Sequence, residues 1–359
     1  MNRTLVSASA ALTVLVSSVA SAASPAGYAD VDGALHGAAQ KANVVSLQFA
    51  AAHDGAIAHT FVTGRANVAS GMAATDVTIY AIESCSKSIT AMAAMKLIDA
   101  GRFSLDTNVF DYLALGKPKS PEVAKITVVE LMNHSAGLPD EIKDDDPSDV
   151  MSKAKAVLGL SKLLFSPGTN QKYSNVGFAV LGAMVEKASG KKYQQYVEDE
   201  VFGPAGITDA QYEDGSKVYP GQATRYGPAG RALKNSITPD GTAGGGWMIS
   251  ATDGAKLLAA YDAGKIVSKA SHDRMLAAPV APLKPRQNGS YFGLGWDVVE
   301  HRNGQVFFGK NGGGNGAHAW LEHDFAGNDF AVFSSGGNGT AAHAPGLKAV
   351  QAALDKAAP

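Results

Sequence analysis

Alternating and periodic apolar positions predict strands near both ends of the chain and helices between them. The runs NVVSLQFAAAH and AIAHTFVTGRA flank Asp54-Gly55 and predict a β-hairpin. Four further strand-like runs, rich in aromatic and β-branched residues, follow later in the chain: YFGLGWDVV, QVFFG, AHAWLEH and DFAVFSS. We expect one antiparallel sheet flanked by helices, built from both chain ends, with an inserted all-helical domain. This arrangement belongs to the α/β (α+β) class.

The helices are marked by apolar stripes and end signals. Residues 86–100 are apolar on most sides, so we expect a buried helix there. Thr127 and Glu130 have the spacing of a capping box that opens a short helix. Apolar residues recur at helical spacing over 178–188, and a last helix is expected over 346–357.

The first residues have the pattern of an export signal. One cation, Arg3, precedes the apolar stretch LVSASAALTVLVSSVA, which ends in Ala20-Ser21-Ala22. The stretch is too short and too weakly apolar for a good membrane span, which needs about 20 predominantly apolar residues. We expect cleavage near Ala22, no membrane span after cleavage, and a periplasmic or secreted protein.

These patterns divide the chain into parts. Residues 1–22 are expected to form the signal peptide, 23–83 and 245–359 the α/β sheet domain, and 84–244 the helical domain. The active site is expected at the interface between the two domains.

Composition and charge narrow the functional class. The chain has 359 residues and a formal net charge of −2, which argues against a basic patch for nucleic acid or an anionic membrane. One cysteine excludes an intramolecular disulfide framework and a cysteine-based zinc site. The motifs Gly-x-Ser-x-Gly and His-Glu-x-x-His are absent, and none of the nine histidines has a ligand-like neighbour. We expect an enzyme without metal or organic cofactor.

A serine and a lysine one helical turn apart suit a hydrolase that needs no histidine, because both lie on one helix face. A lysine buried in a largely apolar site can lose its proton and accept one from serine. The chain has this spacing at three places: Ser84/Lys87, Ser152/Lys155 and Ser189/Lys192. Ser84 alone opens the predicted buried helix, where unpaired N–H groups favour negative charge. We therefore predict Ser84 as the nucleophile.

Two tripeptides add polar groups in chain order. Tyr-Ser-Asn at 173–175 precedes a predicted helix, and Lys-Asn-Gly at 310–312 enters a predicted strand. Each alone has an ordinary structural explanation, as a helix entry and as a glycine turn. The order Ser-x-x-Lys, Tyr-x-Asn, Lys-x-Gly is much harder to attribute to chance.

This ordered set resembles the motifs of the serine β-lactamase and penicillin-binding-protein superfamily, specifically the class C β-lactamase-related branch with its esterases and D-amino-acid peptidases. The resemblance covers nearly all of the chain after the signal. Further segments similar to family landmarks are LMNHSAGLPD, FSPGTNQKYSNVGFAVLGAMVEKASGKKYQQYV, GPAGITDA, AGGGWMISATDG, FGLGWDV and KNGGGNG. The resemblance implies a β-lactamase/transpeptidase-like fold and an acyl-serine mechanism.

Carried over residue by residue, the resemblance implies a nucleophile and a proton-transfer pair. Ser84 would be acylated, Lys87 would accept its proton, and Tyr173 would pass the proton to the leaving group. Which group is the acylation base is disputed within the superfamily, so Lys87 and Tyr173 are treated as a coupled pair.

The resemblance also implies a set of substrate-binding residues: Asn175, Lys310, Asn311, Gly312 and Gly313. Asn175 would contact a substrate amide, and Lys310 would set the electrostatics and meet a substrate carboxylate. The oxyanion hole would be the N–H groups of Ser84 and Gly313. Losing one such donor typically costs about 10²–10³ in rate.

The chain also departs from the family pattern. Asn311 replaces the threonine hydroxyl that helps to hold a carboxylate in β-lactamases, which weakens the case for efficient β-lactam hydrolysis. Cys85 lies about 200° around the helix from Lys87 and is expected to be a packing residue. His134 occupies a structural position of the family. The acidic loop over 140–149 lacks the EF-hand spacing and is expected to be solvated.

We therefore predict an exported serine hydrolase that cleaves a small ester or a D-amino-acid peptide through an acyl-serine intermediate. A class C-like β-lactamase is the alternative enzyme. A penicillin-binding sensor that is acylated without turnover is the alternative outside the enzyme class. The expected partner is a small-molecule or peptide substrate, and the sequence leaves the natural substrate and the oligomeric state open.

Overall fold

The computed structural model describes residues 28–143, 146, 148–213, 215, 217–227, 230–234, 243–314 and 316–337. The expected signal peptide over 1–22 and the expected helix over 346–357 lie outside these residues. None of the helices within them is long and apolar enough to cross a membrane.

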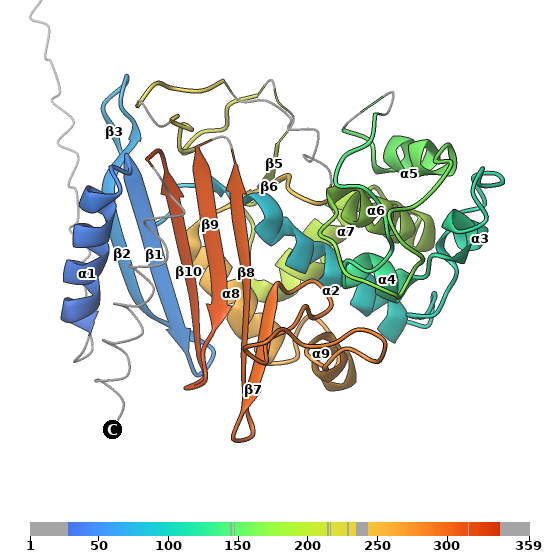
Figure 1. Ribbon diagram of the computed structural model, residues 1–359. Coiled ribbons are helices and arrows are strands. Elements are labelled where there is room, and N and C mark those ends of the chain that lie inside the picture. The colour runs from blue at the N-terminus through green and yellow to red at the C-terminus, as the bar shows by residue number, and fades with distance from the viewer. Residues whose placement is uncertain are drawn as a thin grey trace, which may run out of the picture.

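A seven-stranded sheet lies in the left half of the molecule as drawn in Figure 1. Its strands, in spatial order, are β3 (Met72–Ala73), β2 (Ala56–Asn67), β1 (Ser46–His53), β10 (Asn328–Ser335), β9 (Ala317–His323), β8 (Gln305–Gly314) and β7 (Val298–Arg302). Neighbouring strands are antiparallel, and β1 pairs with β10, so strands from the early and the late part of the chain lie side by side within the sheet. The predicted antiparallel sheet is confirmed.

The β1–β2 hairpin forms for a local reason. Asp54 and Gly55 both have positive φ, 51° and 77°, as the central residues of a type I′ turn require. The segment YFGLGWDVV is predicted as a strand throughout but is a strand only from Val298, while Tyr291 makes an isolated bridge. Gly295 has a φ of 89° and interrupts the extended backbone between them.

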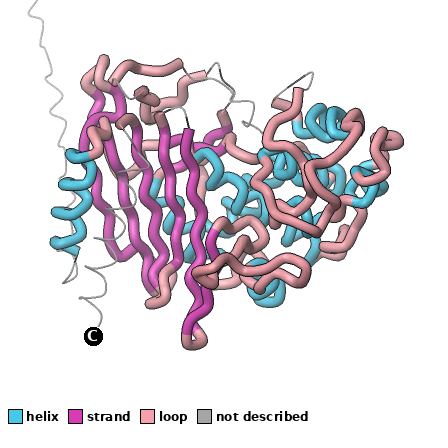
Figure 2. The backbone as a smooth tube through the Cα atoms, viewed as in Figure 1, coloured by secondary structure: helices cyan, strands magenta, loops and turns pink. Residues whose placement is uncertain are grey.

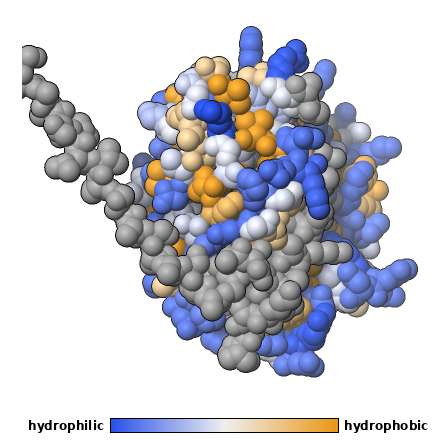
Figure 3. Space-filling model, turned by 90° about the vertical axis from the view of Figure 1, so that its left-hand side faces the viewer, coloured by the Kyte–Doolittle hydropathy of each residue, from blue (hydrophilic) through white to orange (hydrophobic). Residues whose placement is uncertain are grey.

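Helices cover both faces of the sheet. Alternate residues of β1 point to opposite faces: Leu47 and Phe49 pack with α1 (Tyr28–Lys41), whereas Ala50 and Ala52 belong to the larger core that includes α8 (Ala251–Asp262). Figure 3 shows the side that carries α1, where apolar side chains gather in the upper part among hydrophilic ones. The sheet is therefore a middle layer rather than an outer wall.

The other helices gather beside the sheet (Figure 2). The α-helices of this part are α2 (Ser86–Asp99), α3 (Val109–Leu113), α4 (Val128–Met132), α5 (Val150–Leu158), α6 (Asn175–Ser189), α7 (Tyr193–Val197) and α9 (Lys269–Met275). Shorter helical segments are η1 (Glu83–Cys85), η2 (Val123–Lys125), η3 (Glu198–Phe202) and η4 (Gly203–Ala205). A small sheet has the order β4 (Tyr80–Ala81), β6 (Trp247–Ile249) and β5 (Gln211–Tyr212).

The helix signals that the sequence contains coincide with helices in the structure. Most residues of α2 are buried, as its apolar composition predicts. Thr127 and Glu130 form the capping box of α4, and Gly190 ends α6 with a φ of 72°. The division into a sheet domain of 23–83 and 245–359 and a helical domain of 84–244 stays a prediction.

Candidate active site

The predicted nucleophile lies where the small sheet leads into the buried helix. η1 contains Ser84 and runs directly into α2, so Lys87 lies in the first turn of that helix. Ser84 is half-buried, whereas Lys87 is fully buried. The spacing of three residues brings the side chains together, and Lys87 Nζ donates a hydrogen bond to Ser84 Oγ at 3.0 Å.

A second hydroxyl reaches the same oxygen from a distant part of the chain. Tyr173 OH donates a 2.5 Å hydrogen bond to Ser84 Oγ. Tyr173 lies just before α6, whose N-cap residue Ser174 donates to Pro139 O at 2.6 Å and so fastens this turn to the preceding loop. The three side chains predicted to be catalytic therefore meet around one oxygen.

The amine of Lys87 has polar surroundings, which corrects the expectation of a largely apolar site. Its Nζ also donates to Asn175 Oδ1 at 2.5 Å and to Gly244 O at 2.8 Å. Together with Ser84 Oγ, three oxygens surround the amine. The centroid of the Tyr173 ring lies 4.9 Å from Nζ.

Asn175 is held at both ends of its amide. Its Oδ1 accepts from Lys87, while its Nδ2 and its backbone N donate to Asp140 Oδ1 at 3.0 and 3.1 Å. Sequence reasoning assigned Asp140 only to an acidic loop and missed this contact, because no local pattern links positions so far apart. Asn175, predicted to contact substrate, thus also orients Lys87.

Lys310 brings a second amine to the site from β8, with only 1% of its surface exposed. Its Nζ donates to Asp297 Oδ2 at 2.6 Å and to the carbonyl of exposed Asn311 at 3.0 Å, and it lies 5.4 Å from the centroid of the Tyr173 ring. Burial lowers the pKa of Lys310, but the neighbouring Asp297 and Tyr173 outweigh burial and raise it above the ordinary value. Lys310 is therefore a cation, and Asp297, which sequence reasoning missed, offsets part of its charge.

Glycines let β8 approach the nucleophile closely. A Cβ on Gly312 would overlap the carbonyl oxygen of Ile82 and lie 2.9 Å from Ser84 N. The next residue, Gly313, is exposed and pairs with His318 on β9. The strand therefore presents its backbone, rather than side chains, to the turn that carries Ser84.

A comparison with protein families agrees with this fold and these motifs. The family model described as Beta-lactamase matches residues 31–353. The chain belongs to the beta-lactamase family. This is a family of serine hydrolases, and the resemblance and fold class predicted from the sequence are confirmed.

Similar proteins include hydrolases of several kinds. The D-alanyl-D-alanine-carboxypeptidase/endopeptidase AmpH of Escherichia coli (strain K12) is 26% identical over 262 residues, which cover 66% of this chain and 66% of that protein. The structure of a D-amino acid amidase from Ochrobactrum anthropi SV3 has a TM-score of 0.76 at 20% identity and covers 92% of this chain and 99% of that chain. EstCE1, a hydrolase with promiscuous acyltransferase activity, has a TM-score of 0.75 at 20% identity, with 92% and 98% covered. The chain spans 29% to 66% of the length of these curated relatives.

Two further residues of this beta-lactamase family member lie against the groups predicted to be catalytic. Cys85 is fully buried, and burial raises the pKa of its thiol to about 12, which suits a packing residue and not a rival nucleophile. The ring of His134 lies 4.5 Å from the ring of Tyr173, and its Nδ1 accepts from Ser174 N at 3.2 Å. Burial, Lys310 and Lys87 hold the pKa of His134 well below 6.5, so this imidazole is neutral and supports Tyr173 by packing.

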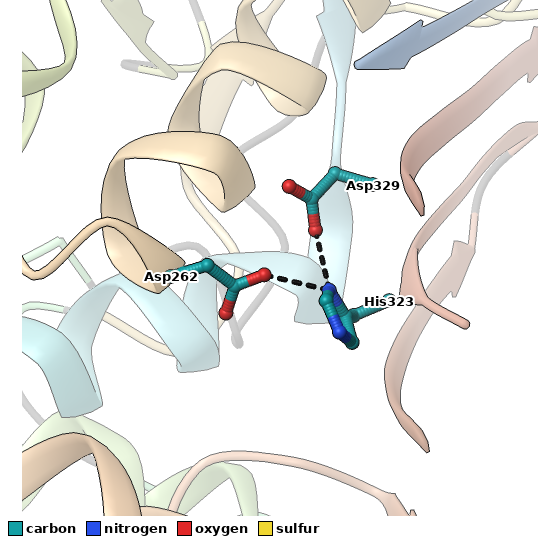
Figure 4. Close-up of side chains that lie close together, drawn as sticks. All are labelled: Asp262, His323 and Asp329. Carbon is teal, nitrogen blue, oxygen red and sulfur yellow. Dashed lines mark hydrogen bonds and ion pairs between the residues drawn. The ribbon is translucent and has the colours of Figure 1, made fainter. Parts of the chain in front are cut away.

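A histidine cluster away from the nucleophile corrects one sequence-based expectation. His323 Nδ1 lies 2.6 Å from Asp262 Oδ2 and 2.8 Å from Asp329 Oδ1, so a histidine does have ligand-like neighbours (Figure 4). Among the described residues, this group is the one whose geometry could hold a metal ion. The distances are those of hydrogen-bonded ion pairs, and the ring of His323 stacks on Phe308.

The protonation of this cluster follows from burial and pairing. Burial lowers the pKa of His323, but Asp262 and Asp329 outweigh it and raise the pKa to about 10. Burial and the neighbouring Asp262 raise the pKa of Asp329 to about 7. Through these ion pairs the cluster connects the end of α8 to β9 and β10. It lies at the opposite end of the β8–β9 pairing from Gly312.

Proposed function

We propose that this protein is an exported hydrolase that cleaves an ester or an amide, either a small ester or a D-amino-acid peptide, through an acyl intermediate on Ser84. The observation that carries the proposal is the convergence of Lys87 Nζ and Tyr173 OH on Ser84 Oγ. A nucleophilic hydroxyl needs a proton acceptor within hydrogen-bond reach, and both candidates lie there.

In the acylation step, Ser84 Oγ attacks the substrate carbonyl carbon while the Lys87–Tyr173 pair takes the hydroxyl proton. The oxyanion that forms is stabilised by the N–H groups of Ser84 and Gly313. The carbonyl then re-forms, the bond to the alcohol or amine breaks, and Tyr173 OH gives a proton to the leaving group. Lys87, held by Asn175 Oδ1 and Gly244 O, keeps its place while the pair changes charge.

In the deacylation step, water attacks the acyl carbon and gives its proton to the same pair. The bond between the acyl carbon and Ser84 Oγ breaks, and the hydroxyl recovers its proton. The cationic Lys310 beside Tyr173 favours the charge that the phenol gains when it loses a proton.

One feature of the chain favours an ester or an amide over a β-lactam. Asn311 lacks the threonine hydroxyl expected of a β-lactamase. The names of a D-amino acid amidase and of EstCE1 among structurally similar proteins support the same order.

Export is the remaining part of the proposal and rests on residues 1–22. Expression of the full chain in a Gram-negative host, followed by N-terminal sequencing of the periplasmic protein, tests it. We expect a new N-terminus close to position 23. Uncleaved protein confined to the cytoplasm would contradict export and leave the chemistry standing.

Covalent labelling tests the nucleophile. We expect the wild type to react with a fluorescent activated phosphonate and to hydrolyse p-nitrophenyl acetate, and Ser84→Ala to do neither. Ser152→Ala is the matched control, because Ser152 and Lys155 repeat the motif spacing elsewhere. Labelling that persists in Ser84→Ala, or that is lost in Ser152→Ala, would refute the assignment.

Rates on three substrates rank the alternatives. The proposal expects turnover of p-nitrophenyl acetate or of a D-Ala-D-Ala peptide to exceed turnover of nitrocefin. Faster nitrocefin hydrolysis would favour the β-lactamase. A fluorescent penicillin that labels Ser84 and is retained for hours, with no turnover of any of the three, would favour the sensor.

A further inference from the structure

Glu83, the residue before the proposed nucleophile, has a backbone conformation that its side chain disfavours. Its φ is +48°, in the left-handed region that favours glycine. A non-glycine residue persists in such a conformation where its surroundings determine it strongly. The restraint on Glu83 comes from its own carboxylate.

That carboxylate belongs to a buried network of three charges. Glu83 Oε1 lies 2.7 Å from Arg225 Nη1, and Arg225 Nη2 donates to both carboxylate oxygens of Glu213, at 2.9 and 2.8 Å. The exposed side-chain fractions are 9% for Glu83, 2% for Arg225 and 3% for Glu213. One guanidinium therefore connects the residue before Ser84 to the segment that follows β5.

Stability is a weak reason for such a network. Burying three charges removes them from water, and this desolvation cost largely offsets their attraction. A planar guanidinium that contacts two carboxylates does, however, fix the positions of both. The network therefore fixes the positions of its members more than it adds stability, and one of these members is Glu83.

The conformation of Glu83 decides where the next N–H points. The peptide between Glu83 and Ser84 carries the Ser84 N–H, one of the two proposed oxyanion donors. From β8, Gly312 approaches the same peptide so closely that a Cβ there would lie 2.9 Å from Ser84 N. The peptide is thus confined by β8 at its backbone and by Arg225 through the side chain of Glu83.

We propose that Arg225 is a positioning residue: by holding Glu83, it orients the Ser84 N–H toward the oxygen of the reacting carbonyl. The inference rests on the proposed function of Ser84. Arg225 acts through Glu83 and does not touch substrate. Its effect is therefore expected on the transition state, where the oxyanion forms, and much less on substrate binding.

The test removes the contact between residue 83 and Arg225 and relieves the backbone strain at residue 83 at the same time. Glu83→Gly takes away the carboxylate, and glycine adopts a φ of +48° without strain. We expect kcat for p-nitrophenyl acetate, per titrated active site, to fall about 10- to 100-fold with KM within about twofold. Complete loss of one oxyanion donor, at about 10²–10³, sets the upper limit. Active sites are counted with the fluorescent phosphonate, so misfolded protein is not included in the rate.

The inhibition constant of a transition-state-like inhibitor would not change if Arg225 had a merely structural role. Phenylboronic acid forms a tetrahedral adduct with a serine oxygen, and an oxygen of that adduct can occupy the oxyanion hole. We expect its inhibition constant to rise about as much as kcat falls in Glu83→Gly. A rise in KM equal to the rise in the inhibition constant would overturn the positioning role.

Two conservative variants serve as controls. Glu83→Gln keeps an amide oxygen that can lie beside Arg225 Nη1, as Glu83 Oε1 does, and is expected to retain kcat within about threefold. Glu213→Gln removes one charge from the same network and leaves the contact between Arg225 and Glu83, so it is expected to lower the melting temperature with kcat also within about threefold. If Glu213→Gln loses as much kcat as Glu83→Gly, general damage to the network explains the loss and the inference fails.

The remaining outcomes also support or refute the inference. If Glu83→Gly does not fold, Arg225→Lys takes its place, because an ammonium cannot contact Glu213 in bidentate fashion while reaching Glu83. We expect Arg225→Lys to lower kcat at least about tenfold per titrated site, and an unchanged kcat overturns the inference. Wild-type turnover that does not depend on Ser84 refutes the proposed function. Turnover that depends on Ser84 but is unchanged in Glu83→Gly refutes only the role of Arg225.

Discussion

Replacing Tyr173 by phenylalanine separates catalysis from stability at the proposed active site. The substitution removes one hydroxyl, which donates at 2.5 Å to Ser84 Oγ. The ring remains, so its packing against His134, with the ring centroids 4.5 Å apart, is kept. Lys87 Nζ still reaches Ser84 Oγ at 3.0 Å, so the serine retains one hydrogen-bond partner.

The two expected effects differ in size. One lost hydrogen bond lowers the free energy of unfolding by about 0.5–1.5 kcal/mol. A lost proton-transfer group lowers kcat by about 10²–10⁴-fold, which corresponds to about 2.7–5.4 kcal/mol in the activation free energy. The loss is expected to be larger for an amide than for p-nitrophenyl acetate, because the amine needs a proton as it leaves whereas p-nitrophenolate does not.

The assay measures kcat on p-nitrophenyl acetate and on D-alanine p-nitroanilide, together with thermal unfolding. Tyr291→Phe is the matched control, since it also loses one tyrosine hydroxyl, which donates to Leu276 O at 2.7 Å. We expect the two variants to lose similar stability and only Tyr173→Phe to lose activity. Tyr173→Phe with an anilide kcat within about threefold of the wild type would refute the role of Tyr173.

Three further substitutions test other parts of the structure. Gly312→Ala is expected to lower kcat at least about 100-fold, because its Cβ overlaps the Ile82 carbonyl and displaces the turn that carries the nucleophile. Lys310→Met is expected to lower kcat/KM for a D-Ala-D-Ala peptide at least about tenfold more than for p-nitrophenyl acetate, since only the peptide has a carboxylate. His323 has a folded pKa of about 10, above its ordinary 6.5, so its stabilising contribution is complete below pH 6.5 and is lost as the pH rises through 10. The difference in melting temperature between the wild type and His323→Gln is therefore expected to shrink over that range.

Each of these expectations has a control and a contrary outcome. Gly309→Ala lies on the same strand, where a Cβ would meet its nearest neighbour at 3.4 Å, and it is expected to remain active within about threefold. Equal losses in both alanine variants would show that β8 is merely sensitive to substitution. Equal losses of both substrates in Lys310→Met would exclude carboxylate recognition. A melting-temperature difference that grows from pH 6.5 to 10 would contradict the charged state of His323.

Local patterns in the sequence determined a large part of this protein. The turn at Asp54 and Gly55, the buried helix α2 and the capping box of α4 depend on residues close together in the chain, so periodicity and turn chemistry suffice to predict them. The contact between Ser84 and Lys87 is of the same kind, because three residues along a helix place both side chains on one face. The ordered motifs then carried the family resemblance.

Only the tertiary structure decided what surrounds those groups. Tyr173 lies 89 residues from Ser84, and Gly244 lies 157 residues from Lys87, so no local spacing sets their contacts or reveals that the lysine amine faces three oxygens. The pairing of Lys310 with Asp297 and of Arg225 with Glu83 depends on how the loop residues Asp297 and Arg225 pack against β8 and η1. Periodicity states which face a side chain occupies, but the partner on the opposite element follows from packing and register, which the whole chain settles together.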